Sequence, residues 1–599
     1  MIYHCEDHTC NYWDEGEKLP ERCPQCGRKL LRANEADMTG DDWTALGNTL
    51  WYAEASDKKR MVDCFRKAAY LGSAWGVCNL GICMEQGNGV EADPVQAFWL
   101  YQQAVEMGSL NAVCCLGVCY QYGIGTAPDA EKAAELYCKA AEYGSPRGQM
   151  LLARAFHDGI GVEADAAEAV HWVRAAAYQR YGEGMHRLGV CYAYGDGVEQ
   201  NWEHAVHWFR EAAESGVSTA MTDLGYCYEK GCGVEQSWEQ AFSWYRRSAE
   251  CGNPVSMSNL GLCYQMGYGV EQNWQEAIKW YEQGAQCGDL QSMHNLACCY
   301  ERGEGVEQNE DRAFYWYRRS AEGGNGSAMC NLGRCYKRGY GVEQNWQEAV
   351  KWYEQGAQCG NLQSMHNLAC CYEHGEGVEQ NMTEAIRWYT AAAEGGNADD
   401  MYELGWQYDH GEGVEQDMKK AICWYERAAE QNHPAAMNSL GECYAMGRGV
   451  PRDLETAMEW YRRAAELGEA MADYNMGWHL EQAGKLSEAY AHYRKAADGN
   501  DDSAWWALGR FYENGVVVAQ DGKEARRCYE TGEKLGSVKC KMRLARCKLL
   551  GIGGRREKKA DLDLCRQALE LAKESSEKED YGYEAEMNLL RRTIAENES

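Results

Sequence analysis

The sequence NPVSMSNLGLCYQMGYGVEQNWQEAIKWYEQGAQCG, residues 253–288, decides the fold because its pattern returns along the chain every 36 residues. Within it, Gly269 belongs to a series of glycines that stand at this one spacing. The series is Gly89, Gly125, Gly161, Gly197, Gly233, Gly269, Gly305, Gly341, Gly377, Gly413 and Gly449. A fixed period of this size is typical of stacked-repeat proteins, in which each unit contacts only its neighbours. We therefore expect one long array of repeats, although 599 residues would otherwise suggest several globular domains.

The first half of each repeat is predicted to be a helix, here named helix A. In the quoted repeat, Asn253 can cap this helix and Pro254 suits its first turn. Apolar and small residues then recur at steps of three and four, namely Met257, Leu260, Gly261 and Tyr264. Gly261 leaves room for a neighbouring helix, and the loop glycines Gly267 and Gly269 can adopt positive φ.

The second half is predicted to be another helix, helix B. Asn273 can cap it, with Glu276 completing a capping box, and its apolar stripe is Ala277, Trp280, Tyr281 and Ala285. Each repeat is thus a helical hairpin. Helix A carries a leucine or methionine followed by glycine or alanine, a pair that can be traced from Leu46-Gly47 to Leu544-Ala545. We call the first residue of the pair the signature leucine; in one repeat it is Met476. The sequence predicts an all-α solenoid of about 15 hairpins over residues 41–573, followed by a capping helix over 574–599.

Composition limits the partners and the compartment. The formal net charge of −32 would repel phosphate backbones, so we expect no nucleic-acid partner. The N-terminus, residues 1–5, lacks the basic and apolar pattern of an export signal. No run of about 20 apolar residues is present to cross a membrane. We therefore expect a cytoplasmic protein, in which the 30 cysteines are reduced and serve packing or metal binding.

Residues 1–32 carry a candidate structural zinc site, followed by a linker over 33–40. Cys23 and Cys26 are separated by two residues, and Gly27 lets the backbone turn under a metal. Cys5 is a third ligand, and the fourth is either Cys10 or His8, between which the spacing does not decide. Four protein ligands leave no open position for catalysis, so the zinc would be structural.

These patterns resemble known families. The repeat reads Ala-x-x-x-Leu-Gly-x-x-Tyr-x-x-Gly-x-Gly-Val and then Ala-x-x-Trp-Tyr-x-x-Ala-Ala, which resembles the Sel-one-like repeats, relatives of the tetratricopeptide repeats. The resemblance covers residues 41–573 and implies a right-handed superhelix that assembles protein complexes. The N-terminal cysteines resemble those of zinc ribbons and rubredoxin-like knuckles.

Some secreted relatives join helix B to the next helix A by a disulfide, and some are described as binding or hydrolysing β-lactams. Here Cys251, Cys287 and Cys359 occupy the first position of that disulfide, but asparagines stand eight residues later, at Asn259, Asn295 and Asn367. Another series, before the helix A tyrosine, is Cys191, Cys227, Cys263, Cys299, Cys335 and Cys371. We expect these thiols to be small buried core residues.

A candidate partner-binding surface follows from aligning helix A on tetratricopeptide geometry. The residues two before, two after and five after the signature leucine should then face the concave groove. In the C-terminal half this rule gives the aromatic residues Tyr402, Trp406, Tyr474, Trp478 and Trp506, and the acidic residues Asp409, Glu442, Glu481 and Glu513. Aromatic side chains suit peptide anchoring, and acids favour Lys or Arg on the partner. The alternative is that these side chains fill a tightly wound superhelix.

The sequence therefore predicts a non-enzymatic scaffold that binds a protein or peptide. A β-lactam or peptidoglycan-related hydrolase, suggested by the resemblance alone, is the alternative, together with an effector or host-interaction protein. His294 with Cys298, and His366 with Cys370, lie four residues apart on a helix, but each pair offers a metal two ligands only.

Overall fold

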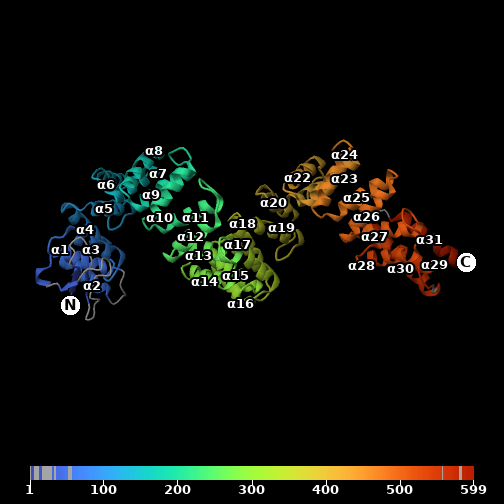
Figure 1. Ribbon diagram of the computed structural model, residues 1–599, viewed down its shortest axis with the longest axis horizontal. Helices are drawn as coiled ribbons and strands as arrows, with labels where there is room; N and C mark the ends of the chain where they lie inside the picture. The colour runs from blue at the N-terminus through green and yellow to red at the C-terminus, as the bar shows by residue number, and fades with distance from the viewer. Residues whose placement is uncertain are drawn as a thin grey trace. The chain divides into compact units, whose positions relative to one another are not determined.

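The computed structural model describes residues 2–5, 13–15, 30–32, 35–51, 57–555, 558–578 and 583–598. The chain divides into two compact units, Met1–Asn309 and Glu310–Ser599. Figure 1 shows the first unit in blue to green and the second in yellow-green to red, each built mainly of paired helices. In chain order the described residues form 31 α-helices. The predicted α-solenoid of tandem helical hairpins is thereby confirmed.

The first unit begins with a small antiparallel sheet. Its strands are β1 (Ile2–Cys5), β2 (Trp13–Glu15) and β3 (Leu30–Arg32), in the order β2-β1-β3. A 3-10 turn, η1 (Glu35–Asp37), follows. The predicted zinc ligands His8, Cys10, Cys23 and Cys26 lie outside the described residues, and Cys5 is placed by its backbone as the last residue of β1.

The helices of the first unit are α1 (Gly40–Thr49), α2 (Lys58–Tyr70), α3 (Ala74–Gln86), α4 (Pro94–Glu106), α5 (Leu110–Tyr122), α6 (Ala130–Glu142), α7 (Pro146–Asp158), α8 (Ala166–Tyr178), α9 (Gly182–Tyr194), α10 (Trp202–Glu214), α11 (Ser218–Lys230), α12 (Trp238–Glu250), α13 (Pro254–Met266), α14 (Trp274–Gln286) and α15 (Leu290–Arg302). The odd-numbered helices are the predicted A helices and the even-numbered ones the B helices. Each A helix from α1 to α13 packs against the B helix that follows it.

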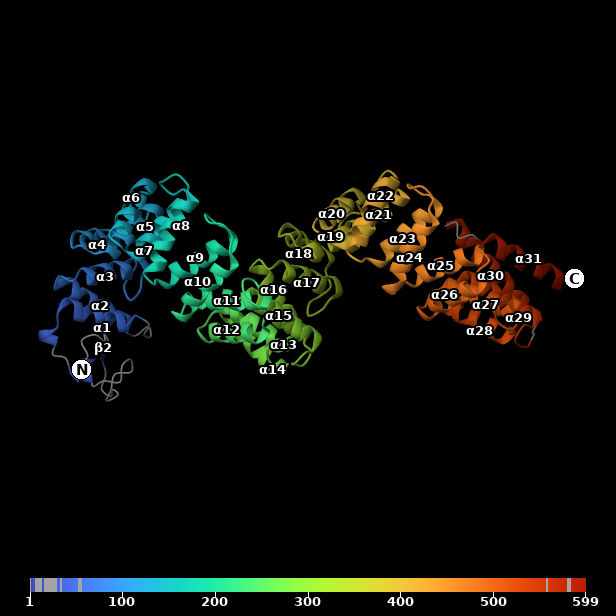
Figure 2. The same cartoon turned by 45° about the horizontal axis from the view of Figure 1, so that its top comes forward.

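The helices of the second unit are α16 (Glu310–Glu322), α17 (Gly326–Arg338), α18 (Trp346–Gln358), α19 (Leu362–His374), α20 (Met382–Glu394), α21 (Ala398–His410), α22 (Met418–Glu430), α23 (Pro434–Met446), α24 (Leu454–Glu466), α25 (Ala470–Gln482), α26 (Leu486–Asp498), α27 (Asp502–Asn514), α28 (Gly522–Lys534), α29 (Val538–Leu550), α30 (Lys558–Lys578) and α31 (Glu584–Glu598). At the C-terminal end, in red, α31 lies against both α29 and α30 (Figure 2).

The predicted caps form where the sequence places them. The Asn273 side chain accepts a hydrogen bond from the Glu276 backbone N–H at 3.1 Å, so the asparagine half of the capping box is present. Helix α13 begins with Pro254 and ends at Gly267, which has a φ of 76° in the left-handed region. Local sequence therefore fixes where this helix starts and stops.

In most hairpins a glycine of helix A and a tyrosine of helix B join the two helices. A Cβ atom added at Gly261 of α13 would lie 2.5 Å from the Tyr281 ring of α14, so a side chain there would displace the ring. The buried Tyr281 hydroxyl donates to the Gln265 side chain at 2.8 Å. The same pairing recurs at Gly225, where the ring is that of Tyr245. The tyrosine thus contributes both apolar packing and a satisfied polar end.

The glycines of the 36-residue series join one hairpin to the preceding one. Gly197 has a φ of +69°, and a Cβ atom there would lie 2.2 Å from the carbonyl oxygen of Ala166, the first residue of α8. The loop after α9 therefore needs glycine at position 197 for two reasons, the positive φ and the close approach to main-chain atoms. This double requirement accounts for the fixed spacing.

The cysteines of the periodic series are buried, as expected. Burial raises the pKa of Cys227 and Cys263 to about 12, so both remain protonated at neutral pH. Cys251, Cys287 and Cys359 are exposed free thiols next to the ends of their B helices. The buried cysteines of the periodic series therefore serve packing, and the three exposed cysteines are not joined in disulfides.

Candidate protein-binding surface

The candidate surface lies on successive A helices of the second unit. Trp406 on α21, Glu442 on α23 and Trp478 on α25 stand 36 residues apart. Each lies two residues after the signature position of its helix, which is Leu404, Leu440 and Met476 respectively. The same face of α23 and α25 is connected by the Asn475 side chain, which donates to Glu442 at 3.2 Å. Equivalent positions on stacked repeats form a continuous row, so the two indoles belong to one face.

The two tyrosines of the surface are half-buried between repeats. The Tyr402 ring stacks on His433, with ring centres 5.0 Å apart, and burial raises the pKa of its hydroxyl. The Tyr474 ring packs against Tyr493 at 5.6 Å, and burial raises the Tyr474 pKa to about 12. Both side chains therefore contribute to the packing of the solenoid as well as to its surface.

The two tryptophans are the larger apolar groups that reach solvent on this row. Trp406 is half-buried and stacks on His410, with ring centres 4.4 Å apart. Trp478 is 38% exposed and meets the edge of His479 at 4.8 Å. Indoles held by a neighbouring ring lose little conformational entropy when a partner covers them, which suits an anchor role.

The acidic residues already have cationic or hydrogen-bonding partners within the chain. Asp409 is 4% exposed and pairs with Arg448 at 3.0 Å. Glu481 accepts from the Tyr493 hydroxyl and from Arg510, each at 2.7 Å. These carboxylates stabilise contacts between hairpins, and a basic partner would have to compete with those contacts.

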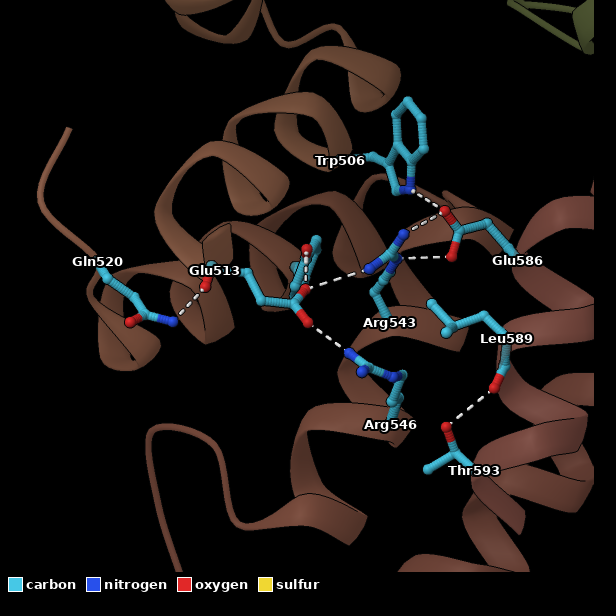
Figure 3. A network of polar contacts seen from close by, with 9 residues as sticks. Trp506, Glu513, Gln520, Arg543, Arg546, Glu586, Leu589 and Thr593 are labelled. Atoms are coloured by element: carbon cyan, nitrogen blue, oxygen red, sulfur yellow. Dashed lines mark hydrogen bonds and ion pairs between the residues drawn. The ribbon is translucent and has the colours of Figure 1, made fainter. Parts of the chain in front are cut away.

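Trp506 and Glu513 belong to a buried network that holds the C-terminal helix (Figure 3). Glu513 of α27 accepts from the Tyr529 hydroxyl at 2.8 Å and from Arg543 of α29 at 3.3 Å, and it also pairs with Arg546. Arg543 donates to Glu586 of α31 at 2.8 Å. The Trp506 indole N–H donates to the same carboxylate at 3.3 Å. Trp506 and Glu513 were predicted to contact a partner protein. In the structure they contact α29 and α31 of the same chain.

The sequence carries a signal for these ion pairs. Arg510 and Arg546 each stand two residues after a signature leucine. Their partners Glu481 and Glu513 stand five residues after the signature position of the preceding repeat, which is Met476 and Leu508 respectively. An acid and an arginine in this relation lie on adjacent A helices and can meet. The role of Glu586 has no such signal, because it depends on where α31 docks.

The histidine and cysteine pairs are structural contacts. His366 lies between Asp400, at 2.7 Å, and the Cys370 sulfur, at 3.6 Å. The hydrogen bond with Asp400 raises the His366 pKa to about 10, so the ring is charged at neutral pH and offsets a buried carboxylate. In the part of the chain that the structure describes, no group of three or more His, Cys, Asp or Glu side chains is arranged to hold a metal ion.

Tandem hairpins with this glycine and tyrosine pattern define an α-solenoid of the repeat class. The Sel1 repeat model matches residues 76–109, 112–145, 146–181, 182–217, 218–253, 254–289, 290–325, 326–361, 362–397, 398–433, 434–469, 470–501 and 504–537. The chain therefore belongs to the Sel1 repeat family, as the resemblance implied. Sel1 repeat solenoids generally mediate protein–protein interactions.

The chain is also similar to proteins of known structure. A protective antigen of uropathogenic Escherichia coli strains, c5321, which displays an SLR fold, is 32% identical with a TM-score of 0.50. The match covers 75% of this chain and 97% of the antigen. A Sel1 repeat protein from Oxalobacter formigenes is also 32% identical, over 41% of this chain and 99% of its own, with a TM-score of 0.39. No curated protein matches the chain.

In the described part of the chain, no helix is both long enough and apolar enough to span a bilayer.

Proposed function

We propose that this protein is a non-enzymatic scaffold that binds a protein segment along the A helices of its second unit, with Trp406 and Trp478 as the main anchors. The observation that carries the proposal is the pair of indoles at equivalent positions of α21 and α25, both reaching solvent. Binding energy at protein interfaces concentrates in a few such aromatic groups. The Sel1 repeat fold supports the same kind of function.

The partner segment should carry Lys or Arg residues. The carboxylates nearest to the indoles are engaged within the chain, so the attraction arises from the whole acidic surface. A net charge of −32 creates a negative potential that steers a basic partner toward the protein and weakens as salt is added. Raising the salt concentration should therefore slow association more than it speeds dissociation.

Replacing Trp406 and Trp478 together by alanine should lower the affinity for the captured partner by about 30-fold or more, which corresponds to about 2 kcal/mol. The physical reason is the loss of both apolar anchors from one face. The measurement is pull-down with the full chain, followed by titration of the identified partner and a circular dichroism spectrum of the variant.

The matched control is Trp99→Ala, because Trp99 is 64% exposed on α4 and lies outside the proposed surface. It should leave the affinity unchanged. If the Trp406/Trp478 variant binds the partner with unchanged affinity, the proposed binding surface is wrong. The hydrolase hypothesis stays a prediction that is tested by measuring nitrocefin turnover. The effector hypothesis and the expected cytoplasmic location also stay predictions, and cell fractionation tests both.

We also propose that the N-terminal segment binds one structural zinc ion through Cys5, Cys23, Cys26 and either Cys10 or His8. The support is the cysteine spacing, together with a three-stranded antiparallel sheet whose first strand ends at Cys5. Purified protein should contain about one zinc per chain, and Cys23→Ser with Cys26→Ser should abolish it. Comparing Cys10→Ser with His8→Ala identifies the fourth ligand, and a metal-free wild-type chain would contradict the site.

A further inference from the structure

Three hairpins of the first unit lack the helix B tyrosine, but Phe65 and Phe209 keep an aromatic ring at that position, whereas Val173 does not. In the normal arrangement the helix B tyrosine packs against the glycine of helix A, as Tyr137 does against Gly117. Its hydroxyl then donates to the residue five after the signature leucine. Examples are Tyr101 to Glu85 at 2.5 Å, Tyr137 to Gln121 at 2.7 Å, Tyr245 to Glu229 at 2.7 Å and Tyr389 to Glu373 at 2.7 Å.

The hairpin of α7 and α8 differs at all three positions of this arrangement. Val173 stands where Tyr137 stands one repeat earlier, Ala153 replaces the glycine, and His157 replaces the hydrogen-bond acceptor. A valine side chain lacks the aromatic ring of a tyrosine and has a smaller volume. The volume that the ring would occupy must therefore be filled by neighbouring side chains or be left open.

The space is left open. A pocket of about 480 Å³ lies at this point, and Ala153, Ala169, Val170 and Val173 line its apolar part. Each of these four side chains is 2–4% exposed, so they form a dry floor. The volume is within the range of about 300–1,000 Å³ that ligand pockets occupy.

The rim of the pocket is polar but balanced in charge. His157 contacts Asp158 at 2.7 Å and Asp196 at 3.3 Å. Arg154 pairs with Asp158 at 3.4 Å, and Arg187 pairs with Asp196 at 3.2 Å. Arg147 also lines the pocket, but its guanidinium donates to the Asn111 side chain at 2.6 Å and to the Cys115 sulfur at 3.7 Å. Because the charged groups of the rim are thus engaged within the chain, the rim favours a neutral group that donates a hydrogen bond over a free anion or cation.

We propose that this pocket binds a phenolic ring, presented as a tyrosine side chain of the partner protein. The ring takes the place of the missing helix B tyrosine, and its hydroxyl donates to a rim carboxylate, as the resident tyrosines donate to their acceptors. Arg154 and His157 stand two and five residues after the signature leucine Leu152, the same positions as Trp406 and Asp409. The pocket, in the first unit, therefore opens on the helix A face that is equivalent to the one used by the proposed function in the second unit, and the protein source of the ring rests on that function.

The test measures binding of p-cresol and of a short tyrosine-containing peptide to the purified full chain by ligand-observed NMR and calorimetry. Both should bind wild-type protein, p-cresol with a Kd of about 1 mM or tighter, which corresponds to about −4 kcal/mol. The double variant Ala153→Gly with Val173→Tyr rebuilds the normal pairing and fills the pocket. It should weaken both interactions at least tenfold and raise the melting temperature.

A second variant keeps the proposal testable from the opposite direction. Tyr245→Val with Gly225→Ala copies the α7–α8 arrangement into the α11–α12 hairpin and should add a second p-cresol site. Wild-type binding that survives the filling variant, or a wild-type chain that binds neither probe, overturns the pocket. If toluene binds with the same affinity as p-cresol, the proposed role of the hydroxyl is wrong.

The two probes separate the sources of the ring. Binding of p-cresol without binding of the tyrosine peptide overturns the partner-protein source and leaves a site for a free phenol. These measurements use purified protein without its partner, whereas the tryptophan variants are judged by partner capture. Failure of the tyrosine-pocket proposal can therefore be distinguished from failure of the proposed scaffold function.

Discussion

Replacing Gly197 by alanine is expected to lower the free energy of unfolding of the surrounding repeats by about 3 kcal/mol. A left-handed φ costs a residue with a side chain about 1–2 kcal/mol. In addition, the new Cβ would lie 2.2 Å from the Ala166 carbonyl oxygen, so the loop must move away from α8. A shift of this kind in a packed interior costs about 1–3 kcal/mol more. Hydrogen exchange of α8 and α9, together with thermal melting, measures the effect.

Gly195→Ala is the matched control for this substitution. Gly195 also has a positive φ, of +75°, but a Cβ there would meet its nearest neighbour, the Gln200 side chain, at 3.4 Å. It should therefore show the conformational cost alone, about 1–2 kcal/mol. Equal losses in the two variants would mean that the close approach to α8 does not contribute, and that the 36-residue spacing has another cause.

Replacing Arg543 by alanine should release the C-terminal helix. The Arg543 side chain is 14% exposed and its partners Glu513 and Glu586 are 9% and 7% exposed, so both carboxylates would lose a buried cationic partner. Removing one member of a buried ion pair costs about 3–5 kcal/mol. Because each repeat contacts mainly its neighbours, the loss should be local. Hydrogen exchange in α31 should rise sharply, while exchange in the first unit should stay constant.

An exposed ion pair provides the control for this prediction. Arg462 pairs with Glu459 and Glu466 on α24, but its side chain is 51% exposed and theirs are 57% and 61% exposed. Solvent screens such pairs, so Arg462→Ala should change stability by less than about 1 kcal/mol. If α31 stays protected in the Arg543 variant, its docking depends on apolar contacts such as those of Met587 and Leu590, which are buried in the same cluster.

Most of the helical framework could be predicted because its determinants are local. Asn273 caps helix α14 and Gly267 ends helix α13, and both functions depend on residues within a few positions in the chain. The antiparallel pairing of helices follows from the short loops between them. The need for Gly197 was also visible, although its contact with Ala166 was not, because that contact joins two repeats.

The candidate site could be predicted less well because its residues have competing uses. Alignment on tetratricopeptide geometry selected Glu481 and Glu513 by their position in the repeat. It does not identify which side chains of the neighbouring repeat contact these two carboxylates. In the structure arginines of the next repeat contact them. The pocket at Val173 had a sequence signal, a valine where the period predicts tyrosine, but its volume depends on how far the neighbours relax.

The contact between Gly197 and the Ala166 carbonyl is made by main-chain atoms, so this joint between two hairpins does not depend on which side chain Ala166 carries. A 36-residue cassette with such a joint can be followed by another copy of the same cassette. Residues 273–308 and 345–380 differ at three positions, 278, 289 and 302, which is what copying such a cassette would leave behind. The length of the array is thus open to evolutionary change by gain or loss of whole cassettes, while each inherited copy remains free to diverge on its outward residues.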